Sequence, residues 1–225
     1  MTELASKRLA RTAGLTPSQL SVLRILTEFP EVSAGYLAQA TQLKHATITS
    51  LIDKLEALGK PSVAALHGTA LGGGLELALG ADIILAADHA NFALPEINSG
   101  TVADAATIKL PKRIPYHIAM ELLFTGRWFD AEEAHRWGLV NRILPAADLM
   151  AEARKMADDL AAGPPLVFAA IKEIAREAEN MKFQDALNRI NGSQFETVER
   201  LYRSEDQKEG ARAFAEKRDP VWTGR

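Results

Sequence analysis

The sequence predicts an α/β domain from about residue 60 to residue 225, preceded by an all-α segment. Residues 61–66 and 83–87 are short apolar, β-prone runs, and between them lie a glycine cluster and a helical pattern. From Asp130 onward helical patterns dominate, separated by caps and breakers such as Gly138 and Gly192. This order of strand, glycine turn, helix and strand, followed by helices, is typical of an α/β fold with a helical C-terminal region.

The composition is that of a globular protein: 47% of the 225 residues are apolar and 24% are charged. The absence of cysteine excludes disulfides, thiol nucleophiles and cysteine-ligated metals. Residues 1–14 lack the apolar stretch of a secretory signal, and no apolar run is long enough to span a bilayer. We therefore expect a soluble, cytoplasmic protein without a membrane partner.

Helical patterns fill the first 59 residues. A capping box at Thr16 predicts a helix over residues 17–27, and Ser33 can cap a second helix. A third helix carries apolar residues at helical spacing, namely Ile48, Leu51, Ile52 and Leu55. A helix, a short turn and an amphipathic helix form a helix-turn-helix pattern, although a purely structural helical cap explains the segment nearly as well.

Three consecutive glycines, Gly72, Gly73 and Gly74, stand where a strand turns into a helix. Glycine allows backbone torsions closed to other residues, and the first N–H groups of a helix have no internal partner and lie at its positive end. An oxyanion would be stabilised there. A tight turn without any ligand explains the glycines equally well.

Two glutamates are candidate acid–base residues. Glu76 lies in the first turn of the predicted helix, and Glu96 follows a strand-like run ending at Pro95. Two carboxylates beside an N–H oxyanion site can divide general-acid and general-base work on a carbonyl compound. In the alternative interpretation, Glu76 only complements the helix dipole and Glu96 is a solvated turn residue.

These segments resemble, in order, the motifs of the crotonase family of enoyl-CoA hydratases and isomerases, over about 165 residues. The matching segments are residues 60–68, 72–82, 92–96, 123–127, 131–134, 138–142 and the tail 214–225. The resemblance implies a partial crotonase (ClpP/crotonase-like) fold over residues 60–225. Within the family, residues 93–96 and 204–206 are most similar to crotonobetainyl-CoA hydratases (carnitinyl-CoA dehydratases).

The resemblance also implies roles for individual residues. Gly73, flanked by Gly72 and Gly74, would offer an oxyanion-hole N–H to the thioester oxygen. Glu76 would activate water and Glu96 would deliver a proton to the α-carbon. No metal or redox cofactor is implied, because coenzyme A is part of the acyl-CoA substrate. Lys217 would meet a coenzyme A phosphate, and the chain would form a trimer or hexamer.

The sequence departs from this family at two places. Residues 1–59 contain no match to the segment that normally supplies the second oxyanion N–H, so we expect impaired activity. Residues 104–109 read Asp-Ala-Ala-Thr-Ile-Lys where the family usually has a glycine pair and an arginine.

Residues 1–59 instead resemble a truncated MarR-type winged-helix DNA-binding domain. Its groove-facing set would be Lys44, His45, Thr47, Thr49, Ser50 and Lys54. The wing is absent, and residues 1–60 carry 7 basic and 5 acidic residues, so we expect DNA binding to be weak. Two alternatives to the hydratase function stay open. The chain could be a MarR-like transcriptional regulator fused to a crotonase remnant, or an inert fusion with neither function.

Overall fold

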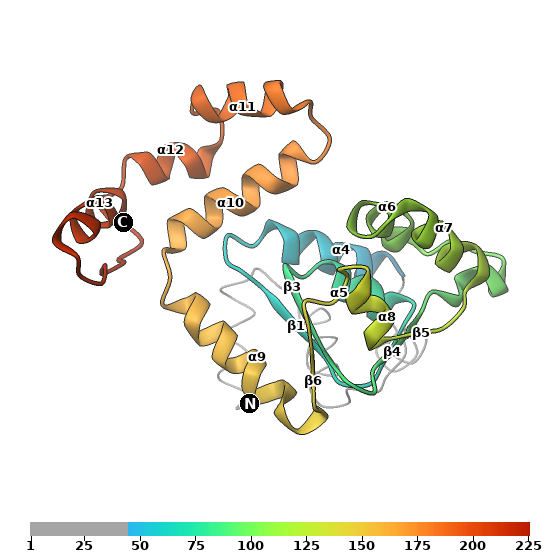
Figure 1. Ribbon diagram of the computed structural model, residues 1–225. Helices are drawn as coiled ribbons and strands as arrows, with labels where there is room; N and C mark the ends of the chain where they lie inside the picture. Colours follow the sequence, from blue (N-terminus) through green and yellow to red (C-terminus); the bar gives the residue numbers. More distant parts are fainter. Residues whose placement is uncertain (1–44) are drawn as a thin grey trace. The chain divides into compact units, whose positions relative to one another are not determined.

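The computed structural model describes residues 45–225 and divides them into two compact units (Figure 1). The first unit contains residues 45–55 and 62–154, and the second contains residues 56–61 and 155–225. Helices of the two units are, in order, α4 (His45–Ala57), α5 (Gly73–Leu79), α6 (Asp104–Arg113), α7 (Tyr116–Thr125), α8 (Ala131–Arg136), α9 (Ala146–Ala161), α10 (Pro165–Ala178), α11 (Phe183–Asn191), α12 (Glu196–Tyr202) and α13 (Glu205–Glu216). A 3-10 helix, η1, spans Pro95–Ser99.

The first unit is built on two three-stranded sheets. One sheet has the order β1 (Val63–Leu66), β3 (Ile83–Ala87), β6 (Arg142–Leu144), and all its strands are parallel. The other has the order β2 (Thr69–Leu71), β4 (Asn91–Ala93), β5 (Phe129–Asp130), with β2 and β4 parallel and β5 antiparallel. The chain therefore runs twice side by side through both sheets, once as β1 and β2 and once as β3 and β4.

Apolar side chains from both sheets and from α5 to α8 form the core of the first unit. Phe92, Leu94 and Leu110 are at most 1% exposed, and the rings of Phe92 and Phe129 lie 5.4 Å apart. The predicted strand over residues 83–87 is confirmed, and the predicted run 61–66 forms a strand from Val63. β3 is apolar throughout and buried at four of its five residues, which is typical of a parallel strand that is covered on both faces.

The third predicted N-terminal helix is present as α4, but it packs on the α/β unit. Leu51 and Ile52 are fully buried, and a Cβ at Gly80 would lie 3.1 Å from Ile52 Cγ2. This burial agrees with the structural interpretation of the segment, since its apolar face covers the turn after α5. The predicted helices over residues 17–27 and after Ser33 lie outside the described residues.

The second unit consists of helices, as the C-terminal patterns predicted. Phe195, Val198 and Ala170 are buried together, and they join α12 to α10. The guanidinium of Arg189 on α11 lies 4.4 Å from the centre of the Phe195 ring, which adds a cation–π contact to this small core.

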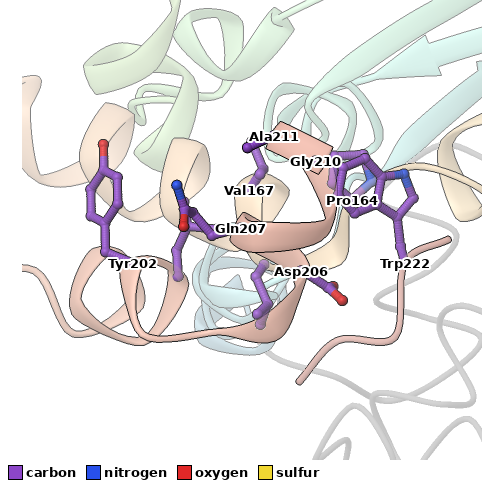
Figure 2. Close-up of a pocket in the computed structure, with 10 residues that line it drawn as sticks. Pro164, Val167, Tyr202, Asp206, Gln207, Gly210, Ala211 and Trp222 are labelled. Atoms are coloured by element: carbon purple, nitrogen blue, oxygen red, sulfur yellow. The ribbon is translucent and has the colours of Figure 1, made fainter. Parts of the chain in front are cut away.

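The last residues of the chain fold back on α13. The buried carboxylate of Asp206 accepts hydrogen bonds from Thr223 N, Thr223 Oγ1 and Gly224 N, each at 2.8 Å. Figure 2 shows Asp206 and Trp222 beside a pocket of about 260 Å³ in this unit. Apart from Asp206, Gln207 and Tyr202, the residues around it are apolar or glycine, and Asp206 is already committed to the tail. The pocket therefore lacks the paired acid–base groups that the sequence predicts for an active site.

Among residues 45–225, no helix combines the length and apolarity needed to cross a bilayer.

Candidate active site

The glycine turn connects β2 to α5 and is tied to the end of β4. Gly72 has φ 53° and ψ −122°, a conformation open to glycine because it lacks a Cβ. Its N–H donates to the carbonyl of Ala93 at 2.9 Å, and its carbonyl accepts the N–H of Glu76 at 3.0 Å. One residue thus connects the strand that precedes η1 to the helix that carries Glu76.

These contacts divide the roles of the three glycines. Because the Gly72 N–H is already donated to Ala93, Gly72 shapes the turn and is not an anion donor. Gly73 and Gly74 are the first two residues of α5, so their N–H groups have no acceptor within the helix. Of the three predicted glycines, Gly73 and Gly74 retain the geometry of an N–H donor pair.

Glu76 is a buried carboxylate, with 5% of its surface exposed. Its Oε1 accepts the backbone N–H of Ala106 at 3.0 Å. Ala106 is the third residue of α6, so its N–H also lacks a partner within its own helix. A buried carboxylate is costly without such a hydrogen bond, and the start of α6 supplies it. Glu76 therefore does more than complement the dipole of α5, because it also joins α5 to α6.

Glu96 is the second residue of η1 and is half-buried. Its backbone carbonyl accepts the N–H of Thr101 at 3.2 Å and the Thr101 hydroxyl at 3.3 Å, and its side-chain Oε2 is buried. Behind η1, a Cβ at Gly126 would lie only 3.0 Å from Ile97 Cγ2, so the loop after α7 packs tightly on this turn. Glu96 is therefore held in place and is not a freely solvated turn residue.

The two glutamates follow closely, in the sequence, the two residues that the Gly72 to Ala93 hydrogen bond joins. Glu76 is four residues after Gly72, and Glu96 is three residues after Ala93, the partner of Gly72. The turn thereby places the start of α5, which carries Gly73, Gly74 and Glu76, and the start of η1, which carries Glu96, at the same end of the parallel strands β2 and β4. An arrangement of N–H donors and two held carboxylates suits acid–base chemistry beside a developing oxyanion.

The remaining predicted residues lie on other helices. Lys217 is exposed in the second unit, at the left-handed C-cap of α13, while its neighbour Arg218 is paired with Glu209 and Glu216. Thr49, Ser50 and Lys54 are half-buried on α4. Lys44 lies outside the described residues, as do the side chains of His45 and Thr47.

The backbone N–H of Ala106 is the functional group that the sequence did not reveal. No side-chain type marks a backbone donor, and its only signal is the start of a helix within residues 104–109. That segment is one of the two places where the sequence departs from the predicted family pattern. The small, buried Ala105 and Ala106 replace the expected glycines and still let α6 approach Glu76.

Comparison with known proteins agrees with this geometry. The family described as enoyl-CoA hydratase/isomerase matches residues 28–225. A carnitinyl-CoA dehydratase of Proteus mirabilis is 45% identical over 181 residues, which cover 80% of this chain and 68% of that protein. The carnitinyl-CoA dehydratase of Escherichia coli K12 is 48% identical over 169 residues, or 75% of this chain and 65% of that one.

Solved structures show the same relationship. The enoyl-CoA hydratase of Mycobacterium tuberculosis H37Rv superposes with a TM-score of 0.68 at 42% identity, covering 74% of this chain and 65% of that one. The enoyl-CoA hydratase of Bacillus anthracis gives a TM-score of 0.76 at 28% identity, and the match covers 92% of this chain and 88% of that one. The crotonase-like α/β fold is therefore confirmed.

The comparisons also bear on the N-terminal segment. The chain spans about two thirds of the length of the curated relatives it matches. The family match begins at residue 28 and so includes residues 28–59, which the sequence pattern assigned to a helix-turn-helix. The MarR-like interpretation, and with it the DNA-binding alternative, gains no support from these matches.

Proposed function

The chain belongs to the enoyl-CoA hydratase/isomerase family, and on this premise we propose that it adds water to, or removes water from, the α,β double bond of an acyl-coenzyme A thioester. The observation that carries the proposal is the buried Glu76, which lies one helical turn beyond the Gly72 to Ala93 hydrogen bond and is held by Ala106. The named relatives, enoyl-CoA hydratases and carnitinyl-CoA dehydratases, support the same reaction class.

Negative charge develops on the thioester oxygen when water attacks the double bond. The N–H of Gly73 would stabilise that charge, since it starts a helix and has no acceptor within that helix. Removal of one such donor typically costs two to three orders of magnitude in rate, so this single backbone group is a large part of the proposed catalysis.

The two glutamates would divide the proton transfers. Glu76, as a carboxylate, takes a proton from water while the water oxygen bonds to the β-carbon. The resulting enolate takes a proton at the α-carbon from Glu96 in its acid form, and the thioester carbonyl is restored. Loss of water follows the same steps in reverse. Only water and protons move, so the reaction calls for no electron acceptor, and coenzyme A arrives as part of the substrate.

Self-association is part of the same proposal. Large apolar side chains remain on the surface of the described residues, including Phe183 at 81% and Phe214 at 88% exposure. Large aromatic side chains are enriched at protein interfaces relative to the rest of the surface. We propose that these helices join copies of the chain in a trimer or hexamer.

The proposed reaction is tested by following the enoyl-thioester absorbance with crotonyl-CoA and crotonobetainyl-CoA. Glu76→Gln and Glu96→Gln should each lower kcat by at least about a hundredfold, as expected when acid or base assistance is removed. Glu132→Gln, on the exposed first turn of α8, is the matched control and should retain the wild-type rate. Wild-type turnover in both site variants would overturn the assignment.

A further inference from the structure

Arg127 lies in the short loop between α7 and β5, and its guanidinium binds a carboxylate on each flanking helix. Its Nε donates to Oε1 of Glu121 on α7 at 2.6 Å. Its two terminal nitrogens donate to the two carboxylate oxygens of Glu133 on α8, at 3.0 and 2.7 Å, and Nη1 also donates to the Trp128 carbonyl at 3.2 Å. An exposed ion pair contributes little to stability, but this one is bidentate and half-buried, and such pairs hold a defined geometry. Arg127 therefore ties α7 to α8.

The loop that Arg127 ties down packs on η1. Gly126, the preceding residue, is buried, and a Cβ built there would lie 3.0 Å from Ile97 Cγ2 and 3.3 Å from the Leu94 carbonyl oxygen. Leu94 precedes Glu96 in the sequence and Ile97 follows it, so the loop contacts both sides of the turn that carries this glutamate. Atoms packed this closely transmit a shift of one segment to the other. The position of η1 therefore depends on the loop at residues 126–127.

A row of aromatic rings joins Arg127 to the strand that leads into η1. The guanidinium carbon lies 5.8 Å from the centre of the Trp137 ring, which lies 6.0 Å from the ring of Phe129. The Phe129 ring in turn lies 5.4 Å from that of Phe92 on β4, and both phenylalanines are buried. β4 ends at Ala93, and η1 begins two residues later. Packing thus connects Arg127 to η1 by two routes, the loop behind the turn and the strand before it.

We propose that Arg127 is a positioning residue for the hydration reaction, because it fixes η1 and thereby the carboxyl group of Glu96. This inference rests on the proposed function, in which Glu96 delivers the proton to the α-carbon. Arg127 itself takes no part in the proton transfer. That transfer requires a donor within hydrogen-bond reach, and a displacement of about 1 Å can cost about a hundredfold in rate. Loss of the Arg127 contacts should therefore slow the reaction even though both acid–base glutamates remain.

Amide hydrogen exchange, followed by mass spectrometry on the full chain, measures the support of η1 without any need for turnover. The reporter is the segment 96–101, in which Gly100 and Thr101 donate their N–H groups to backbone carbonyls of the same turn at 3.1 and 3.2 Å. Arg127→Gln should speed exchange in this segment by at least about fivefold and leave β3 at the wild-type rate. Arg136→Gln, at an exposed arginine in the last turn of α8, is the matched control and should leave both segments unchanged.

Steady-state hydration of crotonyl-CoA tests whether this support acts through Glu96. Arg127→Gln should lower kcat by about tenfold and leave KM within about twofold, since the group that is misplaced acts in the proton transfer. In a chain that already carries Glu96→Gln, the same substitution should change kcat by less than about twofold, because no carboxyl group remains to be oriented. A purely structural role predicts the same fold loss in both backgrounds, since it would only reduce the amount of folded enzyme.

Arg127→Lys is the milder variant, used in the same measurements if Arg127→Gln does not fold. It keeps the positive charge but loses the planar fork that binds both carboxylates, so it should change exchange and kcat in the same direction. Wild-type exchange at residues 96–101 in the folded Arg127 variants, or equal fold losses of kcat in the two backgrounds, overturns the role of Arg127. Selectively faster exchange together with an inactive wild type supports Arg127 as the residue that holds η1 and overturns hydratase chemistry.

Discussion

Oε1 of Glu76, in the first turn of α5, lies 3.0 Å from the backbone nitrogen of Ala106, in the first turn of α6, and accepts its hydrogen bond. This hydrogen bond gives a partner both to a buried carboxylate and to a backbone N–H that has no acceptor within its own helix. The contact fixes Glu76 through the backbone of a neighbouring helix, which does not change with the rotamer of any side chain. The orientation of the proposed base thus depends on where α6 begins.

The first prediction removes that N–H. Ala106→Pro deletes the donor to Glu76, and proline is tolerated in the first turn of a helix. We expect kcat for the proposed hydration to fall by about tenfold or more, because Glu76 loses its fixed orientation. Ala105→Pro, one position earlier, removes an N–H that Glu76 does not use and should retain most of the rate. Equal rates for the two variants in steady-state assays would contradict the positioning role.

Much of the site was predictable because its signals are local. The apolar run over residues 83–87 became β3 with the same bounds, and the three glycines form the predicted turn into a helix. Ala106 was not predictable as the partner of Glu76, because the two residues are 30 positions apart and the donor is backbone. The engagement of the Gly72 N–H was hidden for the same reason, since it depends on β4 lying beside β2.

The helix-turn-helix prediction shows the limit of periodicity. The spacing of Leu51 and Ile52 correctly predicts an amphipathic helix, and α4 spans His45–Ala57. An amphipathic pattern states that one face is buried, but it does not state against what. In the structure, Ile52 packs against Gly80 at the end of α5, and this contact depends on the tertiary fold.

The second prediction concerns the support of η1. Gly126 has φ +61°, and a Cβ there would meet Ile97 Cγ2 at 3.0 Å and Asn98 Nδ2 at 3.1 Å. Gly126→Ala therefore combines backbone strain with a clash against the turn that carries Glu96. We expect a loss of about 2 kcal/mol or more in unfolding free energy and a reduced kcat.

Gly138→Ala is the control for the backbone strain alone. Gly138 has φ +80°, and a Cβ there would have no atom within 4 Å. It should cost only about 1 kcal/mol and leave kcat unchanged. Denaturant titration and initial rates on both variants test the distinction, and an undiminished kcat in Gly126→Ala would show that η1 is not held by this contact.

The third prediction concerns self-association. Phe214 on α13 is 88% exposed, and burial of a phenylalanine stabilises an interface by about 2 kcal/mol. Phe214→Ser should therefore weaken assembly and shift the molar mass in light scattering toward the monomer at micromolar concentration. Lys208→Ser, an exposed polar position on the same helix, should have little effect. A wild-type chain that is monomeric throughout this range would contradict the proposed trimer or hexamer.

The last prediction concerns acid and the C-terminal tail. Two hydrogen bonds from the Arg218 guanidinium, at 2.6 and 3.0 Å, and one from the Val221 N–H lower the pKa of Glu209 from 4.5 to about 2. A carboxylate whose pKa is depressed by folding stabilises the folded state fully above its unfolded pKa. That contribution is lost as pH falls from about 4.5 toward about 2. Asp206 acts in the same direction: burial raises its pKa, but hydrogen bonds from Thr223 and Gly224 outweigh burial and leave it lowered.

Glu209→Gln isolates this contribution, because it keeps the shape of the side chain and removes its titration. At neutral pH the variant should have a lower Tm than wild type, since the amide pairs poorly with Arg218. The difference should shrink as pH falls below about 4.5, where wild-type Glu209 takes up a proton on unfolding. Thermal unfolding of both proteins between neutral and acidic pH, followed by circular dichroism, provides the measurement. A Tm difference that stays constant across this range would mean that the ion pair with Arg218 does not contribute to holding the tail on α13.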